Sequence, residues 1–308
     1  MTFDVVIPTF NHAPLLRKAL ESLLAQTHGD WRAYVVNNFS TDETIEVITS
    51  LDDARINRID FANEGVIGAA RNIGIRAGSA PYVAFLDSDD VWYPRKLERV
   101  MTAFVSGVDV VCHAEYWVEP DGESRVVRYG RGKPVTYESL LYEGNSLSTS
   151  AITMRRSLVE SLDGFSTDRS FITAEDYDLW LRAAKSGASF VTLDEALGEF
   201  RRRDESESSR IARNVAAETA VVSRHFPSQP AMNERWRRRR RLALVDYGAA
   251  RSYQRTGSLG EALKGFGRAL RRFPFLPRAC VALGMLSLQA MTRLVTSRAI
   301  SPGNRAHQ

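Results

Sequence analysis

Short apolar runs alternate with helical patterns through the first hundred residues of the chain. The apolar runs that predict strands lie at residues 3–8, 33–37, 55–60 and 82–86. Apolar residues at helical spacing predict helices over residues 14–26, 42–51 and 65–77. Because strand and helix take turns, the pattern predicts an α/β domain with a mostly parallel sheet flanked by helices.

Polar clusters follow three of these predicted strands. They read "PTFNH" at residues 8–12, "NNFSTD" at 37–42 and "DSDD" at 87–90. In an open parallel sheet, ligands bind beyond the carboxyl ends of the strands. We therefore expect the three clusters to meet at one edge of the sheet and to form a binding site there.

The pattern becomes less regular after about residue 94. "VDVVC" at 108–112 and "SAITMRR" at 150–156 predict strands, and "TAEDYDLWLRAAKSG" at 173–187 predicts a helix with an acidic start and a glycine stop. Glycine and charged residues in the stretch 114–148 predict a loop-rich lobe beside the site. A charged linker at residues 201–210 ends this part of the chain.

Beyond residue 211 the apolar residues follow helical spacing throughout. Residues 246–274 resemble one tetratricopeptide unit, whose repeat positions are occupied by Tyr253, Gly257, Ala262, Phe266, Ala269 and Pro274. We therefore predict a first domain at 1–210 and a C-terminal, all-helical appendage at 211–308. One such hairpin cannot bury its apolar face alone, so we expect it to pack on the first domain, on a partner chain in an oligomer, or on a membrane surface.

Composition narrows the class of protein. The 308 residues are 44% hydrophobic and 25% charged, which is typical of globular proteins. Cys112 and Cys280 lie far apart and give neither a disulfide framework nor a zinc spacing. The start of the chain predicts a strand instead of a signal peptide, and no segment has the roughly 20 apolar residues that span a bilayer. We expect a cytoplasmic protein that is peripheral on the inner face of the cytoplasmic membrane.

The net charge of +4 hides an asymmetry. Residues 1–200 carry 19 basic and 30 acidic residues, a net charge of −11, and residues 201–308 carry 22 and 7, a net charge of +15. The run "RWRRRRR" at 235–241 lacks interleaved aromatic residues beyond Trp236 and any recognisable nucleic-acid-binding fold. We therefore favour anionic lipid headgroups over nucleic acid as its partner. The alternative is the exposed face of a packed helix.

Three carboxylates crowd the end of the predicted strand 82–86. Asp87, Asp89 and Asp90 stand within four residues, where like charges repel. A divalent cation would relieve the repulsion, and carboxylate oxygens are ligands that Mg²⁺ and Mn²⁺ prefer. The alternative is an acidic loop that caps the following helix.

Five segments together resemble the inverting family 2 glycosyltransferases of the GT-A fold. They are "VVIPTFNHAPLLRKALESLLAQT", "VVNNFSTDET", "NEGVIGAARNIGIRAG", "FLDSDDVWYPRKLE" and "AEDYDLWLR", in the family's order within residues 3–205. The resemblance implies a Rossmann-like GT-A sheet and a nucleotide-sugar donor, with a UDP-sugar favoured. It also implies an Asp-x-Asp element made of Asp87, Ser88 and Asp89, in which Asp87 and Asp89 hold Mn²⁺ or Mg²⁺ against the donor diphosphate.

The resemblance assigns further residues to the nucleotide. Pro8 and Thr9 would line the wall beside the base, and Asn37 and Asn38 would face the uracil and ribose. The family usually has at least one Asp at positions 37 and 38, so two Asn residues here leave an uncharged acceptor and predict weaker or altered base binding. An Asx turn before a helix is the alternative. Arg71 would reach the nucleotide or its phosphates, unless it is a solvated helix residue.

The resemblance also implies a catalytic base. Asp176, in "AEDYD", would remove the proton from the acceptor hydroxyl as it attacks, and a single displacement inverts the anomeric configuration. Glu175 and Asp176 as a helix-capping pair are the alternative. Arg203 stands where the family often has His. It cannot bind a metal, so we expect it to contact the leaving diphosphate, or else to lie in a solvated linker.

The expected function is sugar transfer from a nucleotide-sugar to a glycan or lipid-linked glycan during surface polysaccharide or lipopolysaccharide synthesis. Two alternatives stay open. One is a degenerate nucleotide-sugar-binding scaffold without turnover, which the Asn residues at 37 and 38 and the missing His suggest. The other is a nucleotidyltransferase of related fold, although the first strand is not followed by a glycine-rich, basic phosphate loop.

Overall fold

The computed structural model describes residues 2–130, 134–201 and 207–285. The chain forms two compact units. Among the described residues, the first contains 2–130, 134–201 and 220–225, and the second contains 207–219 and 226–285. The predicted division at residue 210 stays a prediction.

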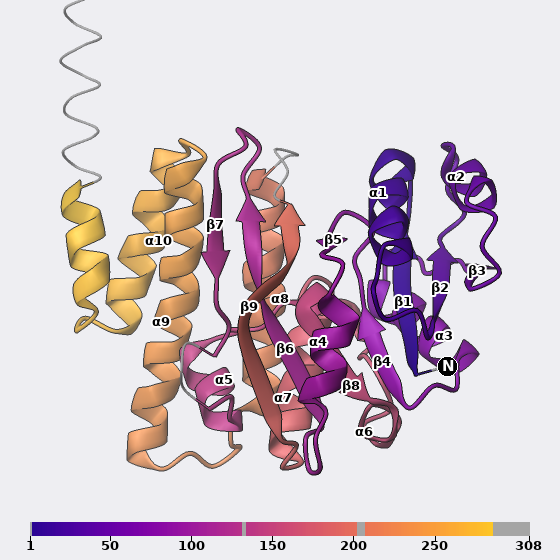
Figure 1. Cartoon of the computed structure of the whole chain (residues 1–308). Coiled ribbons are helices and arrows are strands. Elements are labelled where there is room, and N and C mark those ends of the chain that lie inside the picture. Colours follow the sequence, from indigo (N-terminus) through magenta and orange to yellow (C-terminus); the bar gives the residue numbers. More distant parts are fainter. Residues whose placement is uncertain (1, 131–133, 202–206, 286–308) are drawn as a thin grey trace, which may run out of the picture. The chain divides into compact units, whose positions relative to one another are not determined.

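A single nine-stranded sheet organises the first unit (Figure 1). Its strands are β1 (Phe3–Thr9), β2 (Trp31–Asn37), β3 (Ile56–Asp60), β4 (Tyr82–Phe85), β5 (Val91–Trp92), β6 (Val110–Val118), β7 (Ser124–Val127), β8 (Ile152–Arg155) and β9 (Phe190–Arg201). The order is β3-β2-β1-β4-β8-β6-β9-β5, and β7 pairs with β6. Pairing is parallel among β3, β2, β1 and β4 and between β6 and β9, and antiparallel elsewhere. The expected mostly parallel sheet is confirmed.

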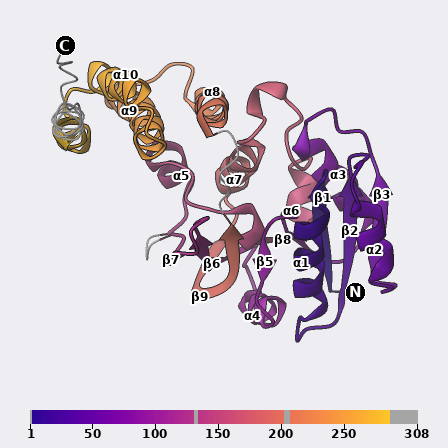
Figure 2. The same cartoon turned by 90° about the horizontal axis from the view of Figure 1, so that it is seen from above.

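Helices cover both faces of this sheet. They are α1 (Ala13–Leu24), α2 (Thr44–Ser50), α3 (Ile67–Ala77), α4 (Lys96–Ala103), α5 (Tyr137–Glu143), α6 (Arg156–Ser161) and α7 (Glu175–Lys185), with 3₁₀ turns η1 (Thr149–Ala151) and η2 (Arg169–Phe171). Figure 2 shows α1, α2 and α4 on one face and α3, α6 and α7 on the other.

The alternation of strand side chains explains these two layers. Phe3, Val5 and Ile7 of β1 point to one face, where they join the buried leucines of α1 in one apolar cluster. On the other face, Phe85 makes an edge contact with Phe165, with ring centres 5.1 Å apart. Both faces of the sheet are therefore buried, as the continuous apolar strands require.

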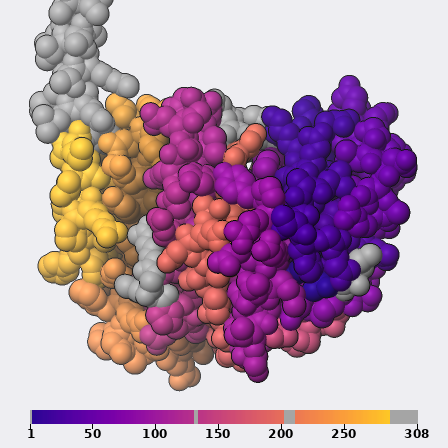
Figure 3. All heavy atoms as spheres, in the orientation of Figure 1, coloured from indigo at the N-terminus to yellow at the C-terminus, as the bar shows by residue number. Residues whose placement is uncertain are grey.

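The expectation of a loop-rich lobe at 114–148 is wrong in part. Strand β6 continues to Val118, turns at Gly122, which has a φ of +88°, and returns as β7. Helix α5 follows, with Thr136 accepting a hydrogen bond from the Ser139 N–H as its cap. In the space-filling view, β6, β7 and β9 form part of the surface (Figure 3). Their partial exposure weakens the apolar pattern that a strand prediction needs.

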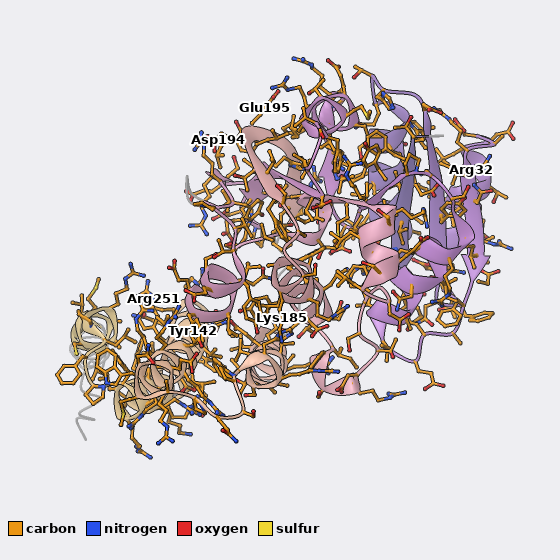
Figure 4. The ribbon with its side chains drawn as sticks, turned by 90° about the horizontal axis from the view of Figure 1, so that it is seen from below. Arg32, Tyr142, Lys185, Asp194, Glu195 and Arg251 are labelled. Atoms are coloured by element: carbon orange, nitrogen blue, oxygen red, sulfur yellow. The ribbon has the colours of Figure 1, made fainter. Side chains whose placement is uncertain are left out.

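Strand β9 was not expected from the sequence either. Its register against β6 shifts so that His113 opposes Leu193 while Ala114 opposes Ala196. The two residues left over, Asp194 and Glu195, are exposed and are labelled in Figure 4. They form a β-bulge that interrupts the apolar pattern of the strand.

The second unit consists of helices. They are most of α8 (Glu207–His225), all of α9 (Met232–Arg255) and α10 (Leu259–Arg272), and a helical stretch at residues 277–285. Gly257, with a φ of +76°, makes the turn between α9 and α10. Ala262, Phe266 and Ala269 are fully buried, at the positions that the tetratricopeptide resemblance assigned. None of the described helices is long and apolar enough to cross a bilayer.

Candidate active site

The carboxyl ends of β1 and β2 bring predicted nucleotide residues together. The Asn38 N–H donates to the Thr9 carbonyl over 3.0 Å, and Pro8 and Thr9 are both buried. The Thr9 hydroxyl has no hydrogen-bond partner among the residues that the structure describes. A buried hydroxyl without a partner is unfavourable, so a ligand atom at this position would stabilise it.

The two asparagines organise the strand-end turn. Asn37 is buried, its Oδ1 accepts from the Ser40 N–H at 3.0 Å, and its Nδ2 donates to Asp60 Oδ1 at 2.8 Å. Asn38 is half-buried and accepts from the Asn63 N–H at 3.0 Å. Asp60 and Asn63 were missed by the sequence reasoning. The pairing of β2 with β3 would have indicated Asp60, because that register makes Asn37 and Asp60 direct neighbours.

Two aromatic rings stand exposed beside this turn. Phe10, directly after β1, is 49% exposed, and Phe39, two residues after β2, is 59% exposed. Phe39 has a φ of +54°, which is uncommon for a bulky residue. The Asn11 N–H donates to Ser40 Oγ over 2.9 Å, so the two loops that carry these rings are tied together.

Along the acidic loop after β4, partly exposed side chains alternate with buried ones. Asp87 and Asp89 are partly exposed, whereas Ser88 and Asp90 are buried. The Ser88 hydroxyl lies 2.8 Å from His12 Nδ1, which ties this loop to the end of β1. The two predicted metal ligands therefore share the accessible side of the loop.

Asp90 points inward and anchors the loop. Its Oδ2 accepts from the Ser150 hydroxyl at 2.6 Å, and its Oδ1 accepts from the Arg201 N–H at 3.2 Å. Burial and the neighbouring carboxylates of Glu115 and Asp89 raise the pKa of Asp90 well above its ordinary value. Asp90, the third carboxylate of the acidic sequence, therefore has a structural role in the loop.

Arg71 joins the acidic loop to the predicted base. It is buried, and its guanidinium donates to Asp87 Oδ1 and to Glu175 Oε1, both at 2.7 Å. Burial acts to lower the pKa of Arg71, and the two carboxylates more than offset that effect, so its pKa lies above the ordinary value. The alternative of a solvated helix arginine is excluded by this burial.

Asp176 lies at the start of α7, directly after Glu175. Its Oδ2 accepts from the Thr149 hydroxyl at 2.9 Å, and its Oδ1 accepts from the Tyr177 N–H at 2.6 Å. Burial and the charge of Glu175 raise the pKa of Asp176 to about 6, against the opposing effects of Arg71 and the Thr149 hydroxyl. A carboxyl group with this pKa is ionised at neutral pH and still basic enough to accept a proton.

Two adjacent hydroxyls of η1 connect these groups. Thr149 donates to Asp176, while Ser150 accepts from the Asp87 N–H at 3.1 Å and donates to Asp90. A single turn therefore positions both the predicted base and the predicted metal-binding loop. Neither hydroxyl was predicted, because "STSA" carries no local signal for such a role.

The donor set of the acidic loop fits a divalent cation. Among the described residues no group of three or more His, Cys, Asp or Glu side chains could hold a metal ion. Asp87 and Asp89 supply carboxylate oxygens on one side of the loop, and Asp87 Oδ2 is not used by Arg71. Mg²⁺ and Mn²⁺ accept one or two carboxylates when substrate phosphates and water complete the coordination. Predicted Arg203 lies outside the described residues.

The sheet order and the strand-end acidic loop define a GT-A domain, as solved structures bear out. TarS of S. aureus, in complex with UDP-GlcNAc, aligns with a TM-score of 0.63 at 20% identity over 92% of this chain and 84% of that one. Mannosyltransferase PcManGT of Pyrobaculum calidifontis, in complex with GDP-Man and Mn²⁺, aligns with a TM-score of 0.64 at 18% identity over 94% and 80%. At these identities the likeness concerns the fold.

The chain belongs to glycosyl transferase family 2. The model of that family matches residues 4–163, which are 160 of the 308 residues. A glycosyltransferase of Nostoc sp. is 36% identical over 173 residues, 53% of each chain. The Escherichia coli UDP-Glc:alpha-D-GlcNAc-diphosphoundecaprenol beta-1,3-glucosyltransferase WfgD is 29% identical over 59% of this chain and 69% of its own. The chain spans about half the length of the Nostoc relative.

Proposed function

We propose that this protein transfers a hexosyl or N-acetylhexosaminyl residue from a UDP-sugar to a glycan or lipid-linked glycan, with inversion at the anomeric carbon. The observation that carries the proposal is the bridge formed by Arg71 between Asp87 and Glu175. It joins the acidic loop expected at the donor diphosphate to the residue beside the expected base. The name of WfgD, which specifies UDP-Glc and a diphosphoundecaprenol acceptor, supports the choice of donor and acceptor.

Asp176 acts as the general base in this proposal. Its Oδ atoms take the proton from the acceptor hydroxyl while the hydroxyl oxygen attacks the anomeric carbon and the bond to the nucleoside diphosphate breaks. The hydrogen bonds from Thr149 and the Tyr177 N–H fix the orientation of the carboxylate. A single displacement leaves no covalent intermediate, and the configuration is inverted.

The strand-end turns bind the nucleotide. The Thr9 hydroxyl and the Asn38 amide supply polar contacts to the base and ribose, and Asn37 holds the turn in shape. Phe10 and Phe39 supply exposed aromatic faces on which a base can stack. Arg71 and Arg203 add positive charge toward the diphosphate, and the buried Ser88 supports the loop.

Asp87 and Asp89 would hold Mn²⁺ or Mg²⁺. A cation held there would supply positive charge to offset the negative charge that develops on the departing nucleoside diphosphate. Membership of family 2 decides against the nucleotidyltransferase alternative. The binding scaffold without turnover is the alternative that the activity test addresses.

The test is sugar transfer by the wild type and by Asp176→Asn, with UDP-glucose and UDP-GlcNAc as donors and diphosphate-linked lipid glycans as acceptors. We expect wild-type turnover, a loss of at least about 100-fold in kcat for Asp176→Asn, and nearly unchanged UDP affinity by calorimetry. Equal turnover in both proteins would remove Asp176 as the base. UDP binding without turnover in the wild type, across donors and acceptors, would favour the scaffold.

A further inference from the structure

The arginine-rich start of α9 is not one uniform solvated face. Residues 231–241 hold six arginines and one glutamate. Arg241 is buried and ion-paired with Glu218, and the Arg238 guanidinium lies over the ring of Phe226, 5.0 Å from its centre. These arginines serve packing within the second unit. The other side of the helix has a different composition.

The outward side of α9 combines apolar and basic residues. Met232 is 78% exposed and Trp236 is 54% exposed, four residues apart. Arg235 and Arg239 are exposed beside them. Residues three and four apart lie on one face of a helix, so these four side chains share one face of α9.

An aromatic residue from the segment after α10 extends this surface. Phe275 is 74% exposed, and its ring is stacked near Trp236 with centres 6.4 Å apart. The buried Phe273 meets Trp236 edge-on at 4.5 Å and supports the indole from within. We name Met232, Arg235, Trp236, Arg239 and Phe275 the aromatic–basic patch. The segment 271–278 adds three arginines and no acidic residue.

We infer that the aromatic–basic patch docks this protein on an anionic lipid bilayer. Large apolar side chains exposed together mark an interaction surface, and Trp beside Arg is the combination that suits the boundary between lipid headgroups and acyl chains. The five residues of the patch contain two positive charges and no carboxylate. A second copy of this chain would bring like charges together, whereas an anionic bilayer complements them.

The inference does not depend on the proposed sugar transfer. Its test uses the full-length protein and vesicles of phosphatidylcholine, with or without phosphatidylglycerol, in the absence of nucleotide and acceptor. We expect binding to the anionic vesicles, weaker binding at high salt, and little binding to phosphatidylcholine alone. Failure of this binding would leave the activity test untouched, and the reverse also holds.

Matched charge variants distinguish binding through the patch from a general effect of positive charge. Arg235→Gln with Arg239→Gln should lower the partition coefficient on anionic vesicles by about 25-fold, because each arginine contributes roughly fivefold. The control, Arg255→Gln with Lys264→Gln, removes the same charge from exposed positions near the other end of the α9–α10 hairpin. The control should bind as the wild type does. Equal losses in both variants would overturn the inference.

The aromatic residues of the patch are tested by a separate measurement. Lipids brominated near the headgroup should quench the fluorescence of the bound wild type more than that of Trp236→Phe. Trp236→Ser with Phe275→Ser should lower binding at least tenfold. Because the indole also packs on the buried Phe273, circular dichroism is used to check that the variant is folded before its binding is measured. Full retention of binding would overturn the inference. So would a concentration-dependent dimer without lipid that Trp236→Ser abolishes, because that outcome assigns the patch to a second copy.

Discussion

At the scale of single residues, opposing effects act on the pKa of the Asp176 carboxyl group. Burial and the neighbouring Glu175 disfavour its charged form, whereas Arg71 and the Thr149 hydroxyl favour it, and the pKa rises to about 6. In the proposed reaction only the ionised form can accept the acceptor's proton. The acid side of the pH–rate profile therefore reports this carboxyl group.

We predict that kcat/KM falls as the pH drops through about 6, since protonation removes the base. In Thr149→Val the carboxylate loses a hydrogen bond that favours its charge, so the acid limb should move upward by a few tenths to one pH unit. Thr149→Ser keeps the hydroxyl and should restore the wild-type limb. The measurement is kcat/KM from pH 5 to about 8 for all three proteins. An unchanged limb in Thr149→Val would contradict a positioning role for Thr149.

At the scale of elements, the first four strands and the most regular helices were predicted closely. The patterns at 14–26, 65–77 and 173–187 correspond to α1, α3 and α7 within about two residues at each end. The apolar residues of these helices recur at helical spacing, although the buried side of α3 also contains Arg71 and Asn72. The Asp194–Glu195 bulge and the β6–β7 hairpin lack such regularity. The bulge arises only from the pairing of β9 with the distant strand β6, and the hairpin is half-exposed.

Some residues of the candidate site were likewise predictable from the sequence, and others were not. The strand-end clusters and the helix that starts at Glu175 were predicted, because the carboxyl ends of parallel strands must meet and the segments resemble family 2. Thr149 and Ser150 could not be found from their neighbours in the sequence. Their hydroxyls gain a role only through hydrogen bonds to distant parts of the chain. Thr149 contacts a residue that is 27 positions away in sequence, and Ser150 contacts one that is 60 positions away. Tertiary contacts of this kind leave no local pattern.

The α9–α10 hairpin offers a test of element packing. A methyl group added at Gly265 would lie 2.8 Å from the Cβ of Ala250, whereas Gly267 has nothing within 4 Å. Gly265→Ala should therefore lower the free energy of unfolding by about 1–2 kcal/mol, through a forced separation of the helices. Gly267→Ala should raise it by up to about 1 kcal/mol, through helix propensity.

Guanidinium unfolding of the two glycine variants, followed by circular dichroism, measures this difference. The pair is matched, because both positions lie in α10 and both changes add the same methyl group. Opposite shifts of the midpoint are expected. Equal stabilisation of both variants would mean that α9 and α10 do not approach closely at Gly265.

At the scale of the whole molecule, the charge is divided between the two ends of the sequence. Residues 1–200 carry a net charge of −11, although the proposed donor is itself an anion. Part of this excess stands in the acidic loop, where Asp87 and Asp89 share the accessible side. Nucleotide and cation should therefore bind together, each offsetting the charge that opposes the other.

This coupling predicts how the stability of the protein responds to ligands. UDP alone or Mn²⁺ alone should move the melting temperature little, and both together should raise it by about 5 °C when present near 100 times the dissociation constant. Asp89→Asn should abolish the joint effect. Asp194→Asn, on the exposed bulge of β9 (Figure 4), removes an equal charge away from the strand-end loop and should preserve it. Equal shifts with Mn²⁺ and with EDTA in the wild type would show that the nucleotide binds without a cation, and the acidic loop would then serve only to cap the segment that follows it.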